Sequence, residues 1–202
     1  MADPYREVDE FGNNMGETML PELDPSYEWH VARYEFATIF MHEGDTVLDV
    51  GCGIGYGSKI LFKKASKYVG FDKYEMRKQR ALQSYPDERS TFLVHSANDA
   101  FPFEDASFDC VVCFEAIEHI ENDILAMSEI YRVLKSGGVF IGSTPVKVEG
   151  HYGGFHAREY SSQEFKDLVG KFFSKVKYLG QGFNMTVVEG LDSKYILCVA
   201  TK

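Results

Sequence analysis

The 202-residue sequence lacks any apolar run long enough to cross a membrane, and its N-terminus lacks a basic start followed by an apolar core. It is also poor in basic charge, because 21 lysines and arginines stand against 31 aspartates and glutamates, a formal net charge of −10. Binding to long nucleic acid relies on a basic face, so we expect neither a nucleic-acid nor a membrane partner. No repeat or low-complexity linker divides the chain, which predicts one domain and leaves its oligomeric state open.

Cysteine is scarce as well. The four cysteines are scattered, which favours a reducing compartment and a cytoplasmic location. Cys110 and Cys113 form a C-x-x-C, but they do so inside a strand-like stretch, where side chains three apart point to opposite faces. We therefore expect buried thiols at both positions rather than a zinc or redox site.

What the sequence does contain is an alternation of helix-like and strand-like segments. Apolar residues at helical spacing predict helices over residues 25–41, 55–65, 73–85, 121–135 and 161–173. Short apolar runs predict strands over residues 46–50, 67–71, 91–95, 108–114, 139–144, 175–183 and 194–202. The alternation indicates an α/β fold with a mostly parallel sheet covered by helices on both faces. No helix separates the last two strands, so we expect them to form an antiparallel pair.

Two of these helices carry recognisable end signals. Gly137 and Gly138 follow the fourth predicted helix and are expected to close it. Ser161 or Ser162 is expected to cap the start of the fifth helix, with Glu164 near the position of a capping box.

The most informative stretch is TVLDVGCGIGYGSKI, residues 46–60, where four glycines follow a buried strand and lead into a helix. Glycine allows sharp turns and lets a ligand approach the backbone without a Cβ in the way. The helix that follows offers unpaired N–H groups and the positive end of its dipole. A turn without a ligand rarely needs four alternating glycines. The stretch therefore predicts a binding site at the carboxyl end of the first strand, where open α/β sheets bind ligands.

Two ligand classes compete for this turn. A dinucleotide would place its pyrophosphate at the helix start, but its usual signature is G-x-G-x-x-G, and here Tyr56 stands where the third glycine belongs. S-adenosylmethionine carries no phosphate but has an ammonium group, and Asp49 near the strand end can compensate that charge. The alternative for Asp49 is a carboxylate that orders the loop.

A second acid supports an adenosine ligand without choosing between the two. Asp72 ends the second strand, 21 residues after Gly51, where a carboxylate can accept hydrogen bonds from both ribose hydroxyls. Asp72 can also cap the helix that follows it, and the two roles are compatible.

Four segments together resemble one family. VLDVGCGIGYGS, VGFD, FPFEDASFDCVVCFEAIEHI and RVLKSGGVFIGSTP are similar, in order and spacing, to the motifs of class I S-adenosylmethionine-dependent methyltransferases, over roughly residues 45–145. The resemblance is strongest to the single-domain branch with PF-x-D-x-SFD and E-x-x-EH, which includes bacterial glycan-associated and ubiquinone-type enzymes. It implies a Rossmann-like sheet of seven strands that ends in the antiparallel pair.

The resemblance also implies which residues hold the cofactor. The glycine turn and Asp49 would line the methionine end, Asp72 the ribose, and the end of the fourth strand the sulfonium and methyl group. The adenine contact would come from Ser96, Ala97, Asn98 or Asp99, since Ser96 stands where an acid is usual. The implied set is Asp49, Gly51, Cys52, Gly53, Asp72, Lys73, Ser96, Ala97, Asn98, Phe114 and Glu115.

On the acceptor side, His119 lies in the sequence EAIEHI and is a candidate general base. In ubiquinone-type O-methyltransferases the residues that match Glu115, Glu118 and His119 are associated with a divalent metal. Many relatives with E-H at this place use none, and we expect no metal here. The alternative for His119 is packing of the loop.

Two further groups are candidates for acceptor contact. His156, Arg158 and Tyr160 follow the fifth strand and offer a base, a cation and a phenol within five residues. They could also brace the loop. Three residues of the first predicted helix, His30, Arg33 and Tyr34, fall on one face and resemble an H-x-x-RY helix that covers the site.

The sequence therefore predicts one methyltransferase domain over 1–202, with an irregular arm and lid helix at 1–41, a cofactor core at 42–145 and an acceptor side at 146–202. We expect S-adenosylmethionine as cofactor, a small-molecule or glycan-like acceptor, and O-methylation rather than N-methylation. His119, His156 and His30 are the candidate catalytic residues, and Arg33, Tyr34, Arg158 and Tyr160 the candidate acceptor contacts. The alternatives are an NAD-dependent oxidoreductase and a non-catalytic subunit that binds the cofactor.

Overall fold

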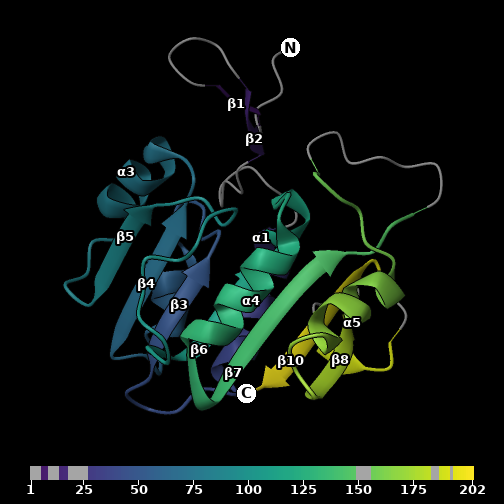
Figure 1. The fold of residues 1–202 in the computed structure, drawn as a ribbon. Helices are drawn as coiled ribbons and strands as arrows, with labels where there is room; N and C mark the ends of the chain where they lie inside the picture. Colours follow the sequence, from purple (N-terminus) through teal and green to yellow (C-terminus); the bar gives the residue numbers. More distant parts are fainter. Residues whose placement is uncertain (1–5, 9–13, 18–26, 149–155, 183–186, 192) are drawn as a thin grey trace.

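A computed structural model describes residues 6–8, 14–17, 27–148, 156–182, 187–191 and 193–202. An eight-stranded sheet with strand order β5-β4-β3-β6-β7-β10-β8-β9 forms the centre of the fold (Figure 1). Its strands are β3 (Thr46–Val50), β4 (Lys67–Asp72), β5 (Ser90–Val94), β6 (Phe108–Phe114), β7 (Leu134–Pro145), β8 (Lys175–Gln181), β9 (Val187–Glu189) and β10 (Tyr195–Thr201). The helices are α1 (Tyr27–Thr38), α2 (Gly57–Leu61), α3 (Glu75–Ser84), η1 (Ile117–His119, a 3₁₀ turn), α4 (Asp123–Val133) and α5 (Ser162–Gly170).

The sheet is parallel from β5 to β7 and antiparallel beyond that strand. β10 pairs antiparallel with both β7 and β8, which confirms the expected terminal pair. The eighth strand, β9, pairs antiparallel with β8 and was not predicted. Its three residues, Val-Val-Glu, are too few to show strand periodicity. The expected α/β class and Rossmann-like arrangement are otherwise confirmed.

The strand order reverses beside β3, which has β4 on one side and β6 on the other. The carboxyl ends of the parallel strands therefore meet at one edge, with the reversal between β3 and β6. Open α/β sheets bind their ligands at this place. The glycine turn leaves the sheet there.

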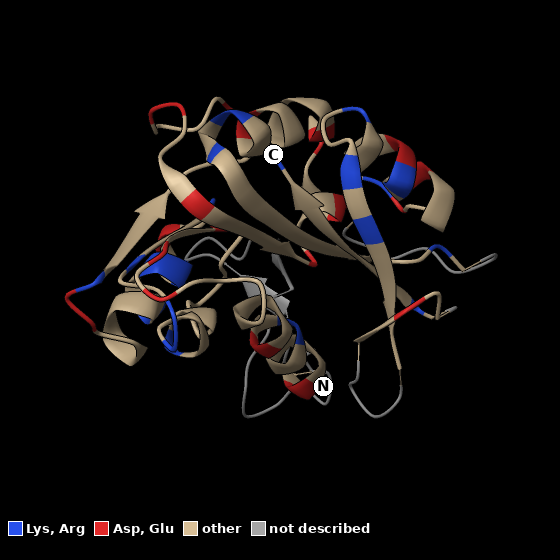
Figure 2. Cartoon of the chain, turned by 90° about the horizontal axis from the view of Figure 1, so that it is seen from below, with Lys and Arg blue, Asp and Glu red and all other residues tan. Residues whose placement is uncertain are grey.

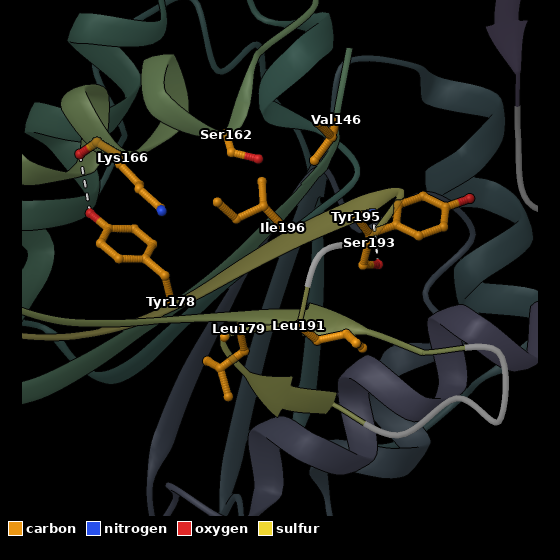
Figure 3. Close-up of a pocket in the computed structure, with 10 residues that line it drawn as sticks. Val146, Ser162, Lys166, Tyr178, Leu179, Leu191, Ser193, Tyr195 and Ile196 are labelled. Atoms are coloured by element: carbon orange, nitrogen blue, oxygen red, sulfur yellow. Dashed lines mark hydrogen bonds between the residues drawn. The ribbon is translucent and has the colours of Figure 1, made fainter. Parts of the chain in front are cut away.

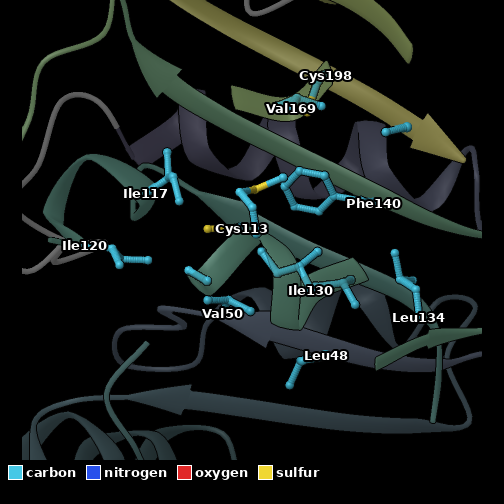
Figure 4. Packing of buried hydrophobic residues seen from close by; sticks show 14 of the residues in the cluster. Leu48, Val50, Cys113, Ile117, Ile120, Ile130, Leu134, Phe140, Val169 and Cys198 are labelled. Atoms are coloured by element: carbon cyan, nitrogen blue, oxygen red, sulfur yellow. The ribbon is translucent and has the colours of Figure 1, made fainter. Parts of the chain in front are cut away.

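Helices cover both faces of the sheet, as expected. Figure 1 shows α4 and α5 in front of the sheet and α1 behind it. Alternate side chains of each buried strand therefore enter different packed layers. Cys113 packs in the layer under α4 and α5, together with Leu48 and Phe140 (Figure 4), whereas Cys110 packs in the opposite layer. All four cysteines are buried free thiols, which confirms the prediction for the C-x-x-C.

The two predicted helix ends differ in outcome. Ser161 caps α5, and its hydroxyl and the Glu164 carboxylate exchange backbone hydrogen bonds in a complete capping box. The closure of α4 by glycine was wrong, because this helix ends at Val133 and β7 begins with the next residue. Gly137 and Gly138 therefore lie inside the strand segment, where Gly137 adopts φ +80°.

The N-terminal arm contains more order than its composition indicated. β1 (Arg6–Val8) pairs antiparallel with β2 (Asn14–Glu17), and the other residues before α1 lie outside the described ones. In the part of the chain that the structure describes, none of the helices is long and apolar enough to span a membrane. Figure 2 shows acidic and basic residues interspersed over the helices and strands in view.

Candidate active site

The first two glycines of the turn follow directly after β3, at its carboxyl end. Gly51 and Gly53 have φ +74° and +54°, in the left-handed region that favours glycine. A Cβ on Gly51 would lie 2.6 Å from the Cβ of Ala116, so this position is closed by packing. A Cβ on Gly53 would meet none of the described atoms within 4 Å. Gly53 is therefore the glycine of this pair that leaves space for a ligand.

The other two glycines are closed by packing within the protein, and Gly55 also lies in the left-handed region, with φ +80°. A Cβ on Gly55 would lie 2.6 Å from the ring of Phe92, and a Cβ on Gly57 would overlap the ring of Tyr34. The second contact allows α1 to lie directly on the start of α2. Glycine is thus required at the four positions for different reasons, and ligand binding accounts for only part of the pattern.

Asp72 lies at the tip of β4, beside this turn, as the ribose role requires. Its carboxylate accepts a 3.2 Å hydrogen bond from the backbone N–H of Gly53 and another from that of Tyr74. The guanidinium of Arg77 contacts both carboxylate oxygens, at 3.2 and 3.3 Å, and stacks on the Tyr74 ring. Asp72 therefore forms a largely buried ion pair that a ribose would have to share or displace. The exposed side chain of Lys73 lies over the same Tyr74 ring, with its Nζ 5.0 Å from the ring centroid.

Asp49 is fully buried within β3. Its Oδ2 accepts hydrogen bonds from the hydroxyls of Tyr34 and Tyr68, at 2.9 and 2.8 Å. Its Oδ1 is buried and has no hydrogen-bond partner among the described residues. Burial raises the pKa of Asp49 to about 7, against the opposing effect of the two phenols. Asp49 therefore ties α1 and β4 to the glycine strand, and one of its oxygens is available for a further donor.

Arg33, which precedes Tyr34 in α1, is a fully buried cation. Its Nε donates to Gln181 Oε1 at 2.8 Å, and its guanidinium lies over the Tyr195 ring at 4.3 Å. Nη1 lies 3.5 Å from Glu115 Oε1, which is an ion pair but not a hydrogen bond. Nη1 and Nη2 are both buried without a hydrogen-bond partner among the described residues. The helix thus carries an unsatisfied donor pair toward the end of β6.

Glu115 itself has an unusual backbone. Its φ is +49°, which is rare for a residue with a side chain and is typical of positions held in place by their surroundings. Its carboxylate accepts from the Ser143 hydroxyl at 2.6 Å, and its N–H donates to the Ser143 carbonyl. Phe114 precedes it and packs edge-on against Tyr34, with ring centroids 5.0 Å apart. The tip of β6 and α1 are therefore in direct contact.

The segment proposed to contact adenine is held by hydrogen bonds to its own side chains. Asn98 donates its N–H to the Ser96 hydroxyl, and its side chain accepts from the Asn122 N–H before α4. Asn98 is thus occupied in bracing, and Ala97 packs against the core. The preceding residue, His95, packs edge-on against Phe71, and its Nε2 is buried without a partner among the described residues. Sequence reasoning gave this imidazole no role because it took His95 as the last residue of the predicted strand 91–95.

His30 lies within a cluster of aromatic rings at the start of α1. Its Nδ1 is 3.0 Å from the hydroxyl of Tyr56, whose ring also packs against Tyr27 and Tyr34. Burial, and secondarily the Arg33 cation, lower the pKa of His30 well below its usual value. The helix therefore presents His30, Arg33 and Tyr34 toward the glycine turn and strand ends, as the H-x-x-RY pattern predicts.

Three acceptor-side residues come together beside Glu115. Glu118 and His119 belong to η1, after β6, and His156 follows β7; one ligand-type atom from each lies within 4.8 Å of the others. The two imidazole rings are 5.0 Å apart. Glu118 is buried and accepts from the Thr144 hydroxyl at 3.1 Å. Burial, followed by the nearby Glu115 carboxylate, raises the pKa of Glu118 well above its usual value.

Arg158 and Tyr160 lie elsewhere, against α4. Both donate to the same oxygen of Asp123, at 2.5 and 2.7 Å, and Tyr160 is 1% exposed. This contact holds the segment after β7 against the first turn of α4. Neither side chain reaches the His119–His156 pair through any interaction that the described residues show. The bracing alternative is therefore the better description of these two residues.

A cavity of about 280 Å³ opens next to α5, apart from the glycine turn (Figure 3). It is lined by Val146, Ser162, Lys166, Tyr178, Leu179, Gly190, Leu191, Ser193, Tyr195 and Ile196. Tyr195 joins it to the site, because the same ring lies over the Arg33 guanidinium. No sequence pattern predicted this cavity, since its walls come from α5, β8, β10, the segment between β9 and β10, and the residue after β7.

A doubly wound sheet with open space beside the Cβ position of Gly53 and a carboxylate at the next strand tip is typical of a Rossmann-like cofactor-binding protein. The model of a family described as a methyltransferase domain matches residues 48–142. A relative from Mycolicibacterium smegmatis, named a probable S-adenosylmethionine-dependent methyltransferase, is 31% identical over 84% of this chain and 68% of its own length. The chain belongs to the S-adenosylmethionine-dependent methyltransferases, and S-adenosylmethionine is its cofactor. The oxidoreductase alternative fails with this result.

Two further comparisons agree. A relative of the same description from Mycobacterium tuberculosis H37Rv is 32% identical over 76% of this chain, which spans only 58% of that relative. The crystal structure of a methyltransferase from Aquifex aeolicus superimposes with a TM-score of 0.67 at 22% identity, covering 88% of this chain and 93% of the other. This structural likeness confirms the fold.

Proposed function

We propose that this methyltransferase transfers the methyl group to a hydroxyl of a small-molecule or glycan-like acceptor. The observation that carries the proposal is the pair of imidazoles of His119 and His156, 5.0 Å apart beside the carboxyl groups of Glu115 and Glu118. A sulfonium is already activated, so the protein has to align the acceptor and, for an alcohol, receive its proton. Imidazole is the side chain best suited to that proton near neutral pH.

The acceptor would approach from the side of β7. Both imidazoles follow strands whose carboxyl ends face that edge, and loops at this edge carry binding groups disproportionately. Residues 149–155, which belong to the predicted acceptor side at 146–202, lie outside the described residues. The assignment of the acceptor to this side of the protein therefore stays a prediction.

Product analysis tests the proposal. The full chain is incubated with S-adenosylmethionine labelled in its methyl group and with separate panels of sugars, phenols and primary amines, and products are assigned by NMR. We expect methyl ethers. Either His156→Ala or His119→Ala should lower turnover by roughly 10²–10⁴-fold, as loss of a general base does, while S-adenosylhomocysteine affinity stays unchanged. Exclusive N-methylation, or full turnover in both variants, would reject this function.

We further propose that Arg33 and Glu115 hold the amino-acid end of the cofactor. That end carries a carboxylate and an ammonium group, and Arg33 and Glu115 offer the opposite charges side by side at 3.5 Å. A buried donor without a partner costs about 1–3 kcal/mol, and more for a charged group. A ligand carboxylate would supply the acceptors that Nη1 and Nη2 lack. Arg33 is thereby reassigned from the acceptor to the cofactor.

Two ligands separate this role from a general effect on the fold. S-adenosylhomocysteine has the amino-acid end, whereas 5′-methylthioadenosine keeps the adenosine and sulfur without it. By calorimetry, Arg33→Gln should weaken the first ligand by about 10–100-fold, the range for a hydrogen bond to a charged group, and leave the second unchanged. Arg33→Lys keeps the charge and should lie between. Equal weakening of both ligands would show that Arg33 acts through the fold.

A further inference from the structure

The side chains of Glu118, His119 and His156 gather three ligand-type atoms in one place. One ligand-type atom from each lies within 4.8 Å of the other two. Ligands on one zinc ion are each about 2.0–2.2 Å from it, so their mutual distances are at most about twice that. Small rotations of the partly buried imidazoles toward the buried carboxylate would bring all three within reach of one ion.

This set differs from the one that the family resemblance implies. In ubiquinone-type enzymes the matching positions would be Glu115, Glu118 and His119. Here Glu115 turns away, because its φ of +49° and its bonds with Ser143 direct its carboxylate toward Arg33. A residue from the segment after β7, His156, stands beside His119 instead. The candidate ligands therefore come from two segments of the chain, η1 and the residues after β7.

The surroundings hold these ligands as outer-shell groups hold them in metal sites. The Thr144 hydroxyl donates to Glu118 Oε2 at 3.1 Å, which fixes the carboxylate. Glu159 Oε1 lies 3.9 Å from His156 Nδ1 on the far end of the loop. The backbone N–H of Arg158 donates to the Glu118 carbonyl at 3.0 Å and ties the two segments together. The three side chains are thus positioned by contacts on both segments.

We propose that Glu118, His119 and His156 bind one divalent transition-metal ion, with Zn²⁺ as the reference ion. Two imidazoles and one carboxylate suit zinc, iron, cobalt or manganese, whereas magnesium and calcium prefer oxygen ligands. A bound ion would act as a Lewis acid toward an acceptor hydroxyl. The imidazoles would then be ligands rather than bases. This inference shares the acceptor class of the proposed function and differs from it in how the hydroxyl is activated.

Metal binding can be measured without turnover. The untagged full chain, stripped with a chelator, is titrated with Zn²⁺ by calorimetry and with Co²⁺ by visible absorption. We expect one equivalent of Zn²⁺ at micromolar or tighter affinity, and Co²⁺ bands typical of nitrogen and oxygen ligands. His156→Ala should weaken Zn²⁺ binding at least tenfold. His42→Ala, which changes a histidine outside the cluster, should have no effect.

Glu115→Gln decides between the two ligand sets. The proposal expects it to leave Zn²⁺ affinity within about twofold, whereas a Glu115–Glu118–His119 site expects it to resemble loss of a ligand. The free energy of unfolding in urea, measured on each variant, shows that the fold is intact. Absence of Zn²⁺ binding, or equal binding by His156→Ala and the parent chain, overturns the metal site. Hydroxyl methylation that persists in the stripped protein would then still support the proposed function.

Discussion

The guanidinium of Arg77 contacts both carboxylate oxygens of Asp72, at 3.2 and 3.3 Å, at the place where the cofactor ribose is expected. The carboxylate that should accept the ribose hydroxyls is therefore already paired in the structure. The backbone N–H of Gly53 donates to the same carboxylate, so the ion pair also joins the tip of β4 to the glycine turn. We therefore expect the Asp72 side chain to serve both cofactor binding and the contact between the tip of β4 and the glycine turn.

Replacement of Asp72 should therefore lower affinity for the cofactor. Asp72→Asn keeps the shape but removes the charge that accepts the ribose hydroxyls, and hydrogen bonds to charged groups contribute about 1.5–3 kcal/mol. We expect S-adenosylhomocysteine to bind roughly 10–150-fold more weakly by calorimetry. Arg77→Met is the matched control, because it breaks the same ion pair and keeps the carboxylate. If both variants lose the same affinity, the ion pair rather than a ribose contact explains the effect.

A second prediction concerns the packing of α1. Gly57→Ala would place a Cβ inside the ring of Tyr34, and overpacking of this kind costs about 1–3 kcal/mol. We expect a lower free energy of unfolding in urea. Gly170→Ala is the matched control, because this helical glycine of α5 has no described atom within 4 Å of its Cβ position. That variant should be neutral or slightly stabilising. Unchanged stability of Gly57→Ala would mean that α1 does not lie on Gly57 in solution.

The same contact shows what the sequence could and could not predict. The alternation of helices and strands and the position of the glycine turn followed from local pattern, and so did the capping box of α5. The reason for each individual glycine could not be predicted, because Gly57 is required by the ring of Tyr34, which lies 23 residues earlier in the sequence. A sequence pattern indicates that a position has no room for a Cβ, but it does not show which neighbouring atom occupies that space.

Long-range partners of the site residues were missed for the same reason. Arg33 was predicted to face the site, but its partner Gln181 is 148 residues away and lies in a strand with no motif. Arg158 and Tyr160 were predicted to contact the acceptor because they follow a strand whose carboxyl end lies at the ligand-binding edge of the sheet. Their pairing with Asp123 depends on where α4 begins in space, and no spacing in the sequence encodes that.

Asp49 should make stability depend on pH. Its folded pKa is about 7, well above the usual value of 3.8 that applies to the unfolded chain. Between these values the folded state binds one more proton, so its contribution to stability falls as pH rises from about 4 to 7 and is level above that. Asp49→Asn can still accept from Tyr34 and Tyr68 without the buried charge. We expect the variant to gain stability over the parent as pH rises from 5 to 8. Parallel curves would place the pKa of Asp49 near its usual value.

His30 should have the opposite dependence. Burial and the Arg33 cation hold its folded pKa well below 6.5, so below that pH the unfolded chain binds the extra proton. The contribution of His30 to stability is therefore complete above pH 6.5 and is lost as pH falls toward its folded pKa. His30→Phe fills the same aromatic cluster without a titrating group, at the loss of the 3.0 Å contact with Tyr56. Unfolding free energies in urea from pH 7.5 to 5 should show the variant, less stable at pH 7.5, approaching the parent as the solution is acidified. A constant difference across this range would show that His30 is protonated as readily in the folded protein as in the unfolded chain, and its place among the rings of α1 would then have to be more open to water than the structure shows.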